Sequence, residues 1–143
     1  MSSSKENIMS SGLYDCFKED LFGGTVDLDS DTIKCALLTS SHSFTQTNTT
    51  WANVSANEIS GTGYTAGGVE LSSKTISVSS GVARWDAADA TWLTSTFTAR
   101  HAVLYDTTNS SSLIASIDFG GDQTISVGTF TVQWSTGGIM ALT

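Results

Sequence analysis

Residues 58–78 read EISGTGYTAGGVELSSKTISV, and this stretch decides how the rest of the chain is organised. Four glycines lie within eight residues of it: Gly61, Gly63, Gly67 and Gly68. Glycine adopts backbone angles that a Cβ atom forbids, so the four predict a loop with a fixed path. Residues 69–78 then alternate in a run rich in Val, Thr and Ser, which is typical of one long strand. The loop therefore feeds a β-sheet.

Glycine-rich loops can also cradle phosphate groups, which makes nucleotide binding an alternative. A phosphate-binding loop is followed by Lys-Ser or Lys-Thr and a helix, and a dinucleotide fingerprint lies between a strand and a helix. No helical pattern follows residues 61–68. We interpret this loop, with Tyr64 inside it, as a structural or contact loop, and we predict no cofactor.

The composition predicts a β protein. The chain has 143 residues, about one domain, of which 39% are hydrophobic and only 14% charged. Ser, Thr and Gly replace the missing charge, and these residues favour strands and turns over helices. We predict a mainly β fold, an antiparallel, jelly-roll-like β-sandwich with one short N-terminal helix. Residues 1–11 are predicted to be a flexible arm, and residues 12–143 a single domain.

The charge and the targeting signals exclude several classes of partner. The net charge is -8, and the six Lys and Arg residues form no basic cluster, so we predict no nucleic-acid partner. No run approaches the roughly 18 apolar residues of a membrane span, and MSSSKENIMSS lacks the apolar core of a signal peptide. We therefore expect no membrane partner and synthesis in a host cytoplasm. Cys16 and Cys35 are then predicted to be free thiols, with a disulfide as the alternative.

The N-terminal quarter predicts an arm and a helix. Within the polar residues 1–9, Ile8 and Met9 are candidate contact residues. A helix is predicted over about residues 11–22, with Ser10 or Ser11 as its cap and the two glycines at 23 and 24 as its end. Its apolar residues recur at helical spacing: Leu13, Cys16, Phe17 and Leu21.

Asp27, Asp29 and Asp31 form an alternating acidic run that resembles the opening of a calcium loop. An EF-hand loop beginning at Asp27 requires Gly at position 32 and Glu at position 38, where this chain has Thr32 and Leu38. We interpret the run as a turn and predict no metal site. Residues 32–39 follow as a strand that directs Ile33, Cys35 and Leu37 to one face.

Residues 40–57 are polar and lack a pattern, so we predict a long surface loop with Phe44 and Trp51 as anchors and contact candidates. Short strands follow, over residues 82–87, 91–93, 97–106, 112–119, 123–126, 129–135 and 139–142. Corners are predicted at Gly81, 107–109, 120–122, Gly128 and 137–138. The chain has no proline and little charge in these strands, so a partner chain is expected to protect the sheet edges.

No motif predicts catalysis. His42 and His101 are the only histidines and so the only candidate general bases near neutral pH. A Ser triad remains open, but no G-x-S-x-G elbow is present, and we interpret His101 as a half-buried, hydrogen-bonded residue. The His and Cys residues do not have the spacing of a zinc-binding motif. Asp86 and Asp89 are interpreted either as the carboxylate pair of a glycosidase or as part of a turn between strands. The four tryptophans raise sugar binding as an alternative, although we expect Trp134 in the core. We predict that the protein is not an enzyme.

Four stretches carry a resemblance to a known family. They are DLDSDTIKCALLTSS (27–41), WANVSANEISGTGYTAGGVELSSKTIS (51–77), ARWDAADATWLTSTFTARHAVLYDTT (83–108) and LIASIDFGGDQTISVGTFTVQWSTGGIMALT (113–143). Together they resemble a family of small virion proteins of tailed bacteriophages. The resemblance runs from about Leu13 to the end of the chain and implies a largely β structural protein, without an active site.

The resemblance and the residues favour the same function. We predict a capsid decoration, or cement, protein on the capsid surface of the virion, with the major capsid protein and itself, as a homotrimer, as partners. A tail, neck or fibre-associated protein is the alternative, and a glycan-binding module is third. The contact candidates are Ile8, Met9, Phe44, Trp51, Gly61, Gly63, Tyr64, Gly67 and Gly68.

Overall fold

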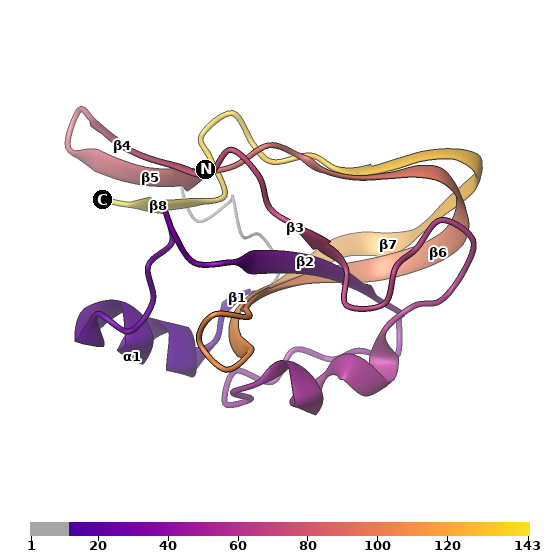
Figure 1. Cartoon of the computed structure of the whole chain (residues 1–143), viewed down its shortest axis with the longest axis horizontal. Coiled ribbons are helices and arrows are strands. Elements are labelled where there is room, and N and C mark those ends of the chain that lie inside the picture. The colour runs from indigo at the N-terminus through magenta and orange to yellow at the C-terminus, as the bar shows by residue number, and fades with distance from the viewer. Residues whose placement is uncertain (1–11) are drawn as a thin grey trace.

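The computed structural model describes residues 12–143, which form two antiparallel sheets and one α-helix (Figure 1). The elements are β1 (Gly12–Leu13), α1 (Asp15–Gly23), β2 (Ile33–Leu38), the 3-10 helices η2 (Trp51–Asn53) and η3 (Ser55–Asn57), β3 (Val69–Glu70), β4 (Thr75–Ser79), β5 (Val82–Asp86), β6 (Ala90–Asp106), β7 (Ser112–Val132) and β8 (Met140–Leu142). The larger sheet has the order β1-β7-β6-β2-β3, and the smaller has the order β4-β5-β8. The predicted mainly β fold with one N-terminal helix is confirmed. The predicted arm, with Ile8 and Met9, lies outside the described residues.

A single bent hairpin, β6 with β7, is the longest feature of the fold (Figure 1). The predicted corner at residues 107–109 is its turn. The corners predicted at residues 120–122 and at Gly128 were wrong, because these glycines lie inside β7. The register between the two strands shifts at four places, and such bulges bend a strand without ending it.

At one of these register shifts, between Ala99 and His101, the odd-numbered side chains of β6 change from one face of the sheet to the other. Phe97 and Ala99 pack in the main core, whereas Val103 and Tyr105 pack in a second core on the opposite face of the sheet. Because side chains alternate with a period of two, one irregularity is enough to reverse them. The shift places His101 on the face that residues 40–57 cover.

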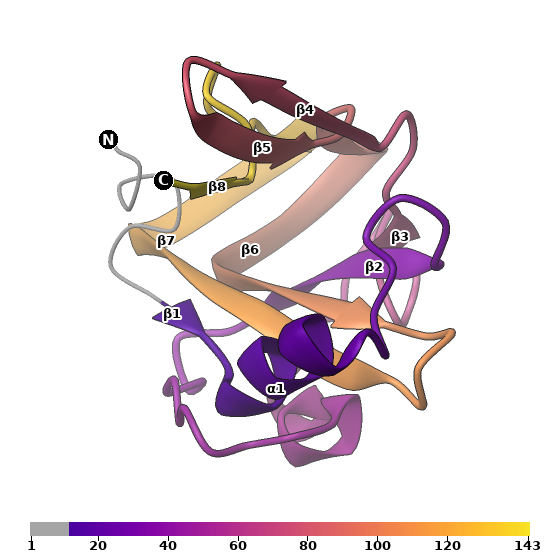
Figure 2. The ribbon, with the colours of Figure 1, turned by 90° about the vertical axis from the view of Figure 1, so that its left-hand side faces the viewer.

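The central strand β2 is buried on both faces. Ile33, Cys35 and Leu37 contribute to the main core, and Ala36 and Leu38 to the second, as the alternation predicted. The main core also contains residues from α1, β5 and the segment before β8: Phe17, Trp85 and Ile139. Figure 2 shows β4, β5 and β8 in front of the upper halves of β6 and β7, with α1 below them. The second core is completed by Val54, with Phe44 and Trp51 packed against it.

The helix begins later than predicted. Gly12 and Leu13 pair with Ser116 and Ala115 of β7 as strand β1, so helix α1 starts only at Asp15. Residues 12 and 13 form their backbone hydrogen bonds with β7, and no serine side chain caps the helix. The predicted C-terminal end is confirmed at Gly24, whose φ of 75° is left-handed and whose N–H donates to the carbonyl of Asp20.

The long strand predicted over residues 69–78 is divided in two. Val69 pairs with Cys35 in the larger sheet, and Thr75 pairs with Asp86 in the smaller one. Between them the chain turns at Ser73, whose φ is 54°, and Leu71 is buried in the main core. The stretch therefore connects the two sheets instead of extending one of them.

Both cysteines are free, as predicted. Cys35 is fully buried in β2, and burial raises the pKa of its thiol to about 12. The Cys16 thiol lies 3.3 Å from the carbonyl oxygen of Leu113. A buried thiol with a raised pKa remains protonated and behaves as a small apolar group.

Candidate functional site

The predicted contact glycines approach the protein's own strands. A Cβ atom on Gly61 would lie 2.8 Å from the Thr96 carbonyl oxygen. One on Gly63 would overlap the Ser95 hydroxyl, and one on Gly68 would overlap the Cys35 carbonyl group. Gly68 is buried, whereas Gly61 and Gly63 remain exposed on their other side. The close approach that requires glycine is therefore made within the chain, against β2 and β6.

The carboxylate of Glu58 holds the glycine-rich loop in place. It accepts hydrogen bonds of 2.6 Å from the Tyr64 hydroxyl and from the Gly67 N–H. The Tyr64 oxygen in turn accepts the N–H of Leu37, and the Tyr105 hydroxyl donates to the Gly67 carbonyl. Burial, then the bond to Glu58, raises the pKa of Tyr64 far above its usual range. Tyr64 is thus an internal anchor, and Glu58 is a residue that the sequence did not reveal.

Phe44 and Trp51 anchor residues 40–57, as predicted, and their contacts lie within the chain. The Trp51 ring stacks on Tyr105, with centroids 4.7 Å apart and planes 7° from parallel. Phe44 meets Tyr14 edge to face at 5.0 Å. Each ring is half-buried, so one side of each already has a protein partner.

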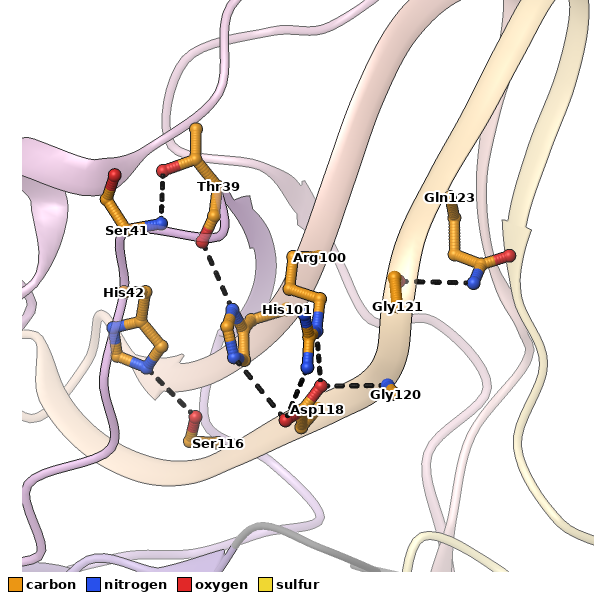
Figure 3. Close-up of polar contacts among 10 residues, drawn as sticks. All are labelled: Thr39, Ser41, His42, Arg100, His101, Ser116, Asp118, Gly120, Gly121 and Gln123. Carbon is orange, nitrogen blue, oxygen red and sulfur yellow. Dashed lines mark hydrogen bonds and ion pairs between the residues drawn. The ribbon is translucent and has the colours of Figure 1, made fainter.

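Two histidines form a polar cluster beneath residues 40–57 (Figure 3). The His42 and His101 rings meet edge to face at 4.9 Å, and both are buried. His42 Nε2 lies 3.1 Å from the Ser116 hydroxyl oxygen. His101 Nδ1 lies 3.1 Å from the Thr39 carbonyl oxygen and must donate, because a carbonyl only accepts. The prediction that His101 is hydrogen-bonded is confirmed, although the residue is buried more deeply than expected.

Asp118 completes this cluster. Arg100 Nε donates to its Oδ1 atom at 2.8 Å, and the Gly120 N–H donates to the same oxygen at 2.8 Å. The Arg100 guanidinium, followed by the Gly120 N–H, lowers the pKa of Asp118 below its usual value. The second oxygen, Oδ2, lies 3.8 Å from His101 Nε2. A cavity of about 250 Å³ adjoins these groups, lined by Ser40, His42, Ser43, Phe44, Arg100, His101, Ser116 and Asp118.

The cluster is built to hold elements together. Ser116 and His42 have the spacing of a nucleophile and its base, but Ser116 is fully buried at the edge of this cavity, so its hydroxyl is not exposed to solvent as a nucleophile's would be. Burial, then the charge of His101, lowers the pKa of His42 to about 4, against the effect of Asp118. Such a histidine is neutral at pH 7 and a weak base. We interpret the cluster as a tie between residues 40–57 and the β6–β7 hairpin.

This tie predicts a loss of stability in acid. The folded His42 has a pKa near 4 and the unfolded one near 6.5, so the unfolded state binds more protons between these values. The His42 contribution to the free energy of unfolding is therefore complete above pH 6.5 and falls by up to about 3 kcal/mol towards pH 4. NMR titration of the His42 ring measures the folded pKa directly. A midpoint near 6.5 would contradict the prediction.

The predicted acidic run is a turn. Asp27 Oδ1 accepts the N–H groups of Asp29 and Ser30, at 3.0 and 3.2 Å, and Asp31 Oδ2 accepts the Asp27 N–H at 2.9 Å. A hydrogen bond from the Ser30 side chain, followed by the backbone N–H bonds of Asp29 and Ser30, lowers the pKa of Asp27. Within residues 12–143, no three His, Cys, Asp or Glu side chains gather closely enough to hold a metal ion.

A buried carboxyl group, Asp106, faces this turn and was missed by the sequence analysis. Its Oδ1 atom accepts the N–H groups of Thr108 and Asn109, at 2.9 and 3.2 Å. Burial, then Asp31 beside it, raises the pKa of Asp106 to about 6. The neighbouring carboxyl group of Asp31 adds to this effect, because like charges disfavour the ionisation of Asp106.

An apolar surface lies on the smaller sheet. Ile76 and Val78 of β4 are 55% and 72% exposed, and Leu142 of β8 is 65% exposed. Ile76 and Leu142 border a groove of about 200 Å³ between α1 and the sheet, lined by Leu13, Phe17, Leu21, Leu28, Ile76, Ala83, Arg84, Trp85, Met140, Ala141 and Leu142. The sequence analysis placed Ile76 and Val78 inside a long strand and so missed this surface.

Comparisons of the chain with protein-family models, with curated proteins and with solved structures find no match. No helix among residues 12–143 has the length and apolar character needed to cross a membrane.

Trp134, expected in the core, is only half-buried at its edge. Its indole N–H donates to the Ala88 carbonyl at 3.1 Å, and its backbone N–H donates to the Asp89 carboxylate at 3.0 Å. Polar indole groups of this kind favour a position where one side of the ring is apolar and the other is wet. The bond to Trp134 supports the interpretation of residues 86–89 as a turn.

Proposed function

We propose that the protein is a non-enzymatic virion structural protein of a tailed bacteriophage, of the capsid decoration or cement type. It would bind the major capsid protein on the capsid surface and stabilise the lattice by protein contacts. The four stretches that resemble small virion proteins support this assignment. The structural observation that carries it is the apolar groove beside α1, with the exposed Leu142 at its rim.

Exposed apolar groups in such a groove favour a protein partner. Burial of a leucine side chain contributes about 1.5 to 3 kcal/mol, so covering the exposed part of Leu142 contributes about 1 to 2 kcal/mol. The groove itself is lined almost entirely by apolar side chains. An apolar concave surface next to an exposed rim is typical of a site where another protein docks.

The internal polar groups support a contact role for the protein. Tyr64 donates to Glu58, while His42 bonds Ser116 and His101 donates to the Thr39 carbonyl. These bonds fix residues 40–68 against the sheets. These groups rigidify the surfaces they support. A rigid surface loses little conformational entropy on binding, which suits a protein that functions by attachment alone.

The test uses particles of the encoding phage that lack the protein, to which purified protein is added. We expect wild-type protein to bind the capsid and to raise the temperature at which heated particles release DNA. Leu142→Glu is expected to bind at least about tenfold more weakly, because a charge then faces the apolar partner. Cryo-electron microscopy locates the bound protein.

The matched control is Leu93→Glu, since Leu93 is exposed to a similar degree, 68% against 65% for Leu142, but lies on β6 away from the groove. It is expected to retain wild-type occupancy. Equal occupancy of wild type and Leu142→Glu would refute the groove as the attachment site. If the bound protein were found only on tails, the tail, neck or fibre alternative would replace the decoration role.

A further inference from the structure

Strand β4 is an unpaired edge of the smaller sheet as residues 12–143 describe it, since the strand order is β4-β5-β8. All five of its residues, Thr75–Ser79, are exposed. The strand carries no charge, proline or glycine, which are the residues that usually protect an edge. Such an edge offers free N–H and C=O groups to a further strand.

The turn beside β4 determines which of its groups are free. Ser80 and Gly81 have φ values of 52° and 78°, as a two-residue type I′ turn requires, and Ser79 pairs with Val82 across them. The residues that flank such a turn are a hydrogen-bonded pair, and the bonding alternates along an antiparallel ladder. Ser77 therefore bonds inward to β5. Ile76 and Val78 direct their N–H and C=O groups outward.

We propose that β4 pairs with β4 of a second copy of this chain, antiparallel, about a twofold axis at Ser77. This register places Ile76 of one copy opposite Val78 of the other, so the outward groups of both residues meet in four hydrogen bonds. The two small sheets become one sheet of six strands, in the order β8-β5-β4-β4-β5-β8. This proposal does not rest on the capsid role, although Ile76 belongs both to this contact and to the groove.

The same register also brings apolar side chains together. Ile76 pairs with Trp85 of β5, and Val78 pairs with Ala83, so both project to the face that borders the groove. In the dimer, Ile76 and Val78 of both copies form a cluster of four side chains across the axis. Cross-strand pairs of β-branched residues stabilise an antiparallel ladder.

Charge favours this contact over others on the molecule. A net charge of -8 makes two copies repel each other, unless they meet where acidic side chains are absent. Arg84 of β5 lies opposite Ser77, so in the dimer the two Arg84 residues are three strand spacings apart, about 14 Å. This distance exceeds the screening length of about 8 Å at physiological ionic strength, so the repulsion between the two arginines is largely screened. A symmetric edge pairs with itself and closes as a dimer, which favours a twofold over the threefold expected from the sequence.

Cysteine cross-linking tests the register. The axis places Ser77 opposite its own copy as a non-hydrogen-bonded pair, with Cα atoms about 4.5 Å apart, so Ser77→Cys is expected to form a disulfide-linked dimer on mild oxidation. The matched control is Ser79→Cys, whose two copies are separated by about 14 Å and are expected to remain unlinked. Wild-type protein controls for Cys16 and Cys35. Equal cross-linking of both variants would overturn the register.

Light scattering across a concentration series tests the assembly without any cross-link. We expect wild-type protein to form dimers and Val78→Lys to dimerise at least tenfold more weakly, while Thr124→Lys, on the exposed side of β7, behaves as wild type. Melting curves verify that each variant is folded. A wild-type protein that is monomeric at every concentration, or trimeric, would overturn the proposal.

Discussion

Replacement of Gly68 by alanine is expected to lower the free energy of unfolding by about 3 to 5 kcal/mol, through overpacking and backbone strain together. A Cβ atom at this position overlaps the Cys35 carbonyl group in the central strand β2, and the φ of Gly68 is 83°. β2 is buried on both faces, so it cannot move away from the new methyl group. Urea denaturation followed by tryptophan fluorescence measures the loss.

Gly81→Ala is the matched control for this experiment. Its φ of 78° is nearly the same, but nothing lies within 4 Å of a Cβ atom there. The control therefore measures the backbone strain alone, about 1 to 2 kcal/mol. Similar losses in the two variants would show that contact with β2 is not what requires a glycine at position 68.

Replacement of Asp106 by asparagine is expected to stabilise the protein by about 1 to 3 kcal/mol at pH 7.5. The pKa of Asp106 is about 6 in the folded state and near 3.9 when unfolded, so the folded state binds more protons between these values. Its contribution to stability is therefore present in acid and is lost as the pH rises through about 6. Asparagine avoids this loss and keeps an oxygen that accepts the Thr108 and Asn109 N–H groups.

The pH dependence distinguishes this explanation from a general change in packing. The gain from Asp106→Asn should shrink as the pH falls through about 6 and disappear near pH 3, below both pKa values, where the carboxyl group is protonated in the folded and unfolded states. The His42 contribution has the opposite sign over an overlapping pH range, so in the wild type the two contributions oppose each other between pH 4 and 6. The Asp106→Asn profile should rise with pH, and the His42→Gln profile should fall. A gain that is constant from pH 4 to 8 would contradict the assignment.

Structural features that depend on a local sequence pattern could be predicted from the sequence. The alternation of Ile33, Cys35 and Leu37, the left-handed end of the helix at Gly24 and the turn at Gly81 each depend on neighbouring residues, and each is confirmed. The errors arose where a local signal has two meanings. Gly120 and Gly121 are typical of a turn, yet they lie in a bulged strand because the partner strand continues past them.

The polar groups of the candidate site could not be predicted in the same way. His42 and Ser116 are 74 residues apart, and Asp31 meets Asp106 only because β2 pairs with β6. Contacts at that separation depend on register, which a single shift between Ala99 and His101 resets. The exposed edge at β4 was equally hidden, because the turn at Ser73 that separates it from β3 has no strong turn residue.

The β6–β7 hairpin also has a consequence for the order in which the chain folds. Its first pairs, Asp106 with Ser112 and Tyr105 with Leu113, close the shortest loop in the larger sheet, so they carry the smallest entropy cost. The addition of β2, and of β1 beside β7, closes loops of roughly 70 and 100 residues. Topologies dominated by such distant contacts fold slowly, over milliseconds to seconds. Until β2 and β1 have paired, nothing covers the two faces of these strands, and their apolar residues are open to association with other chains.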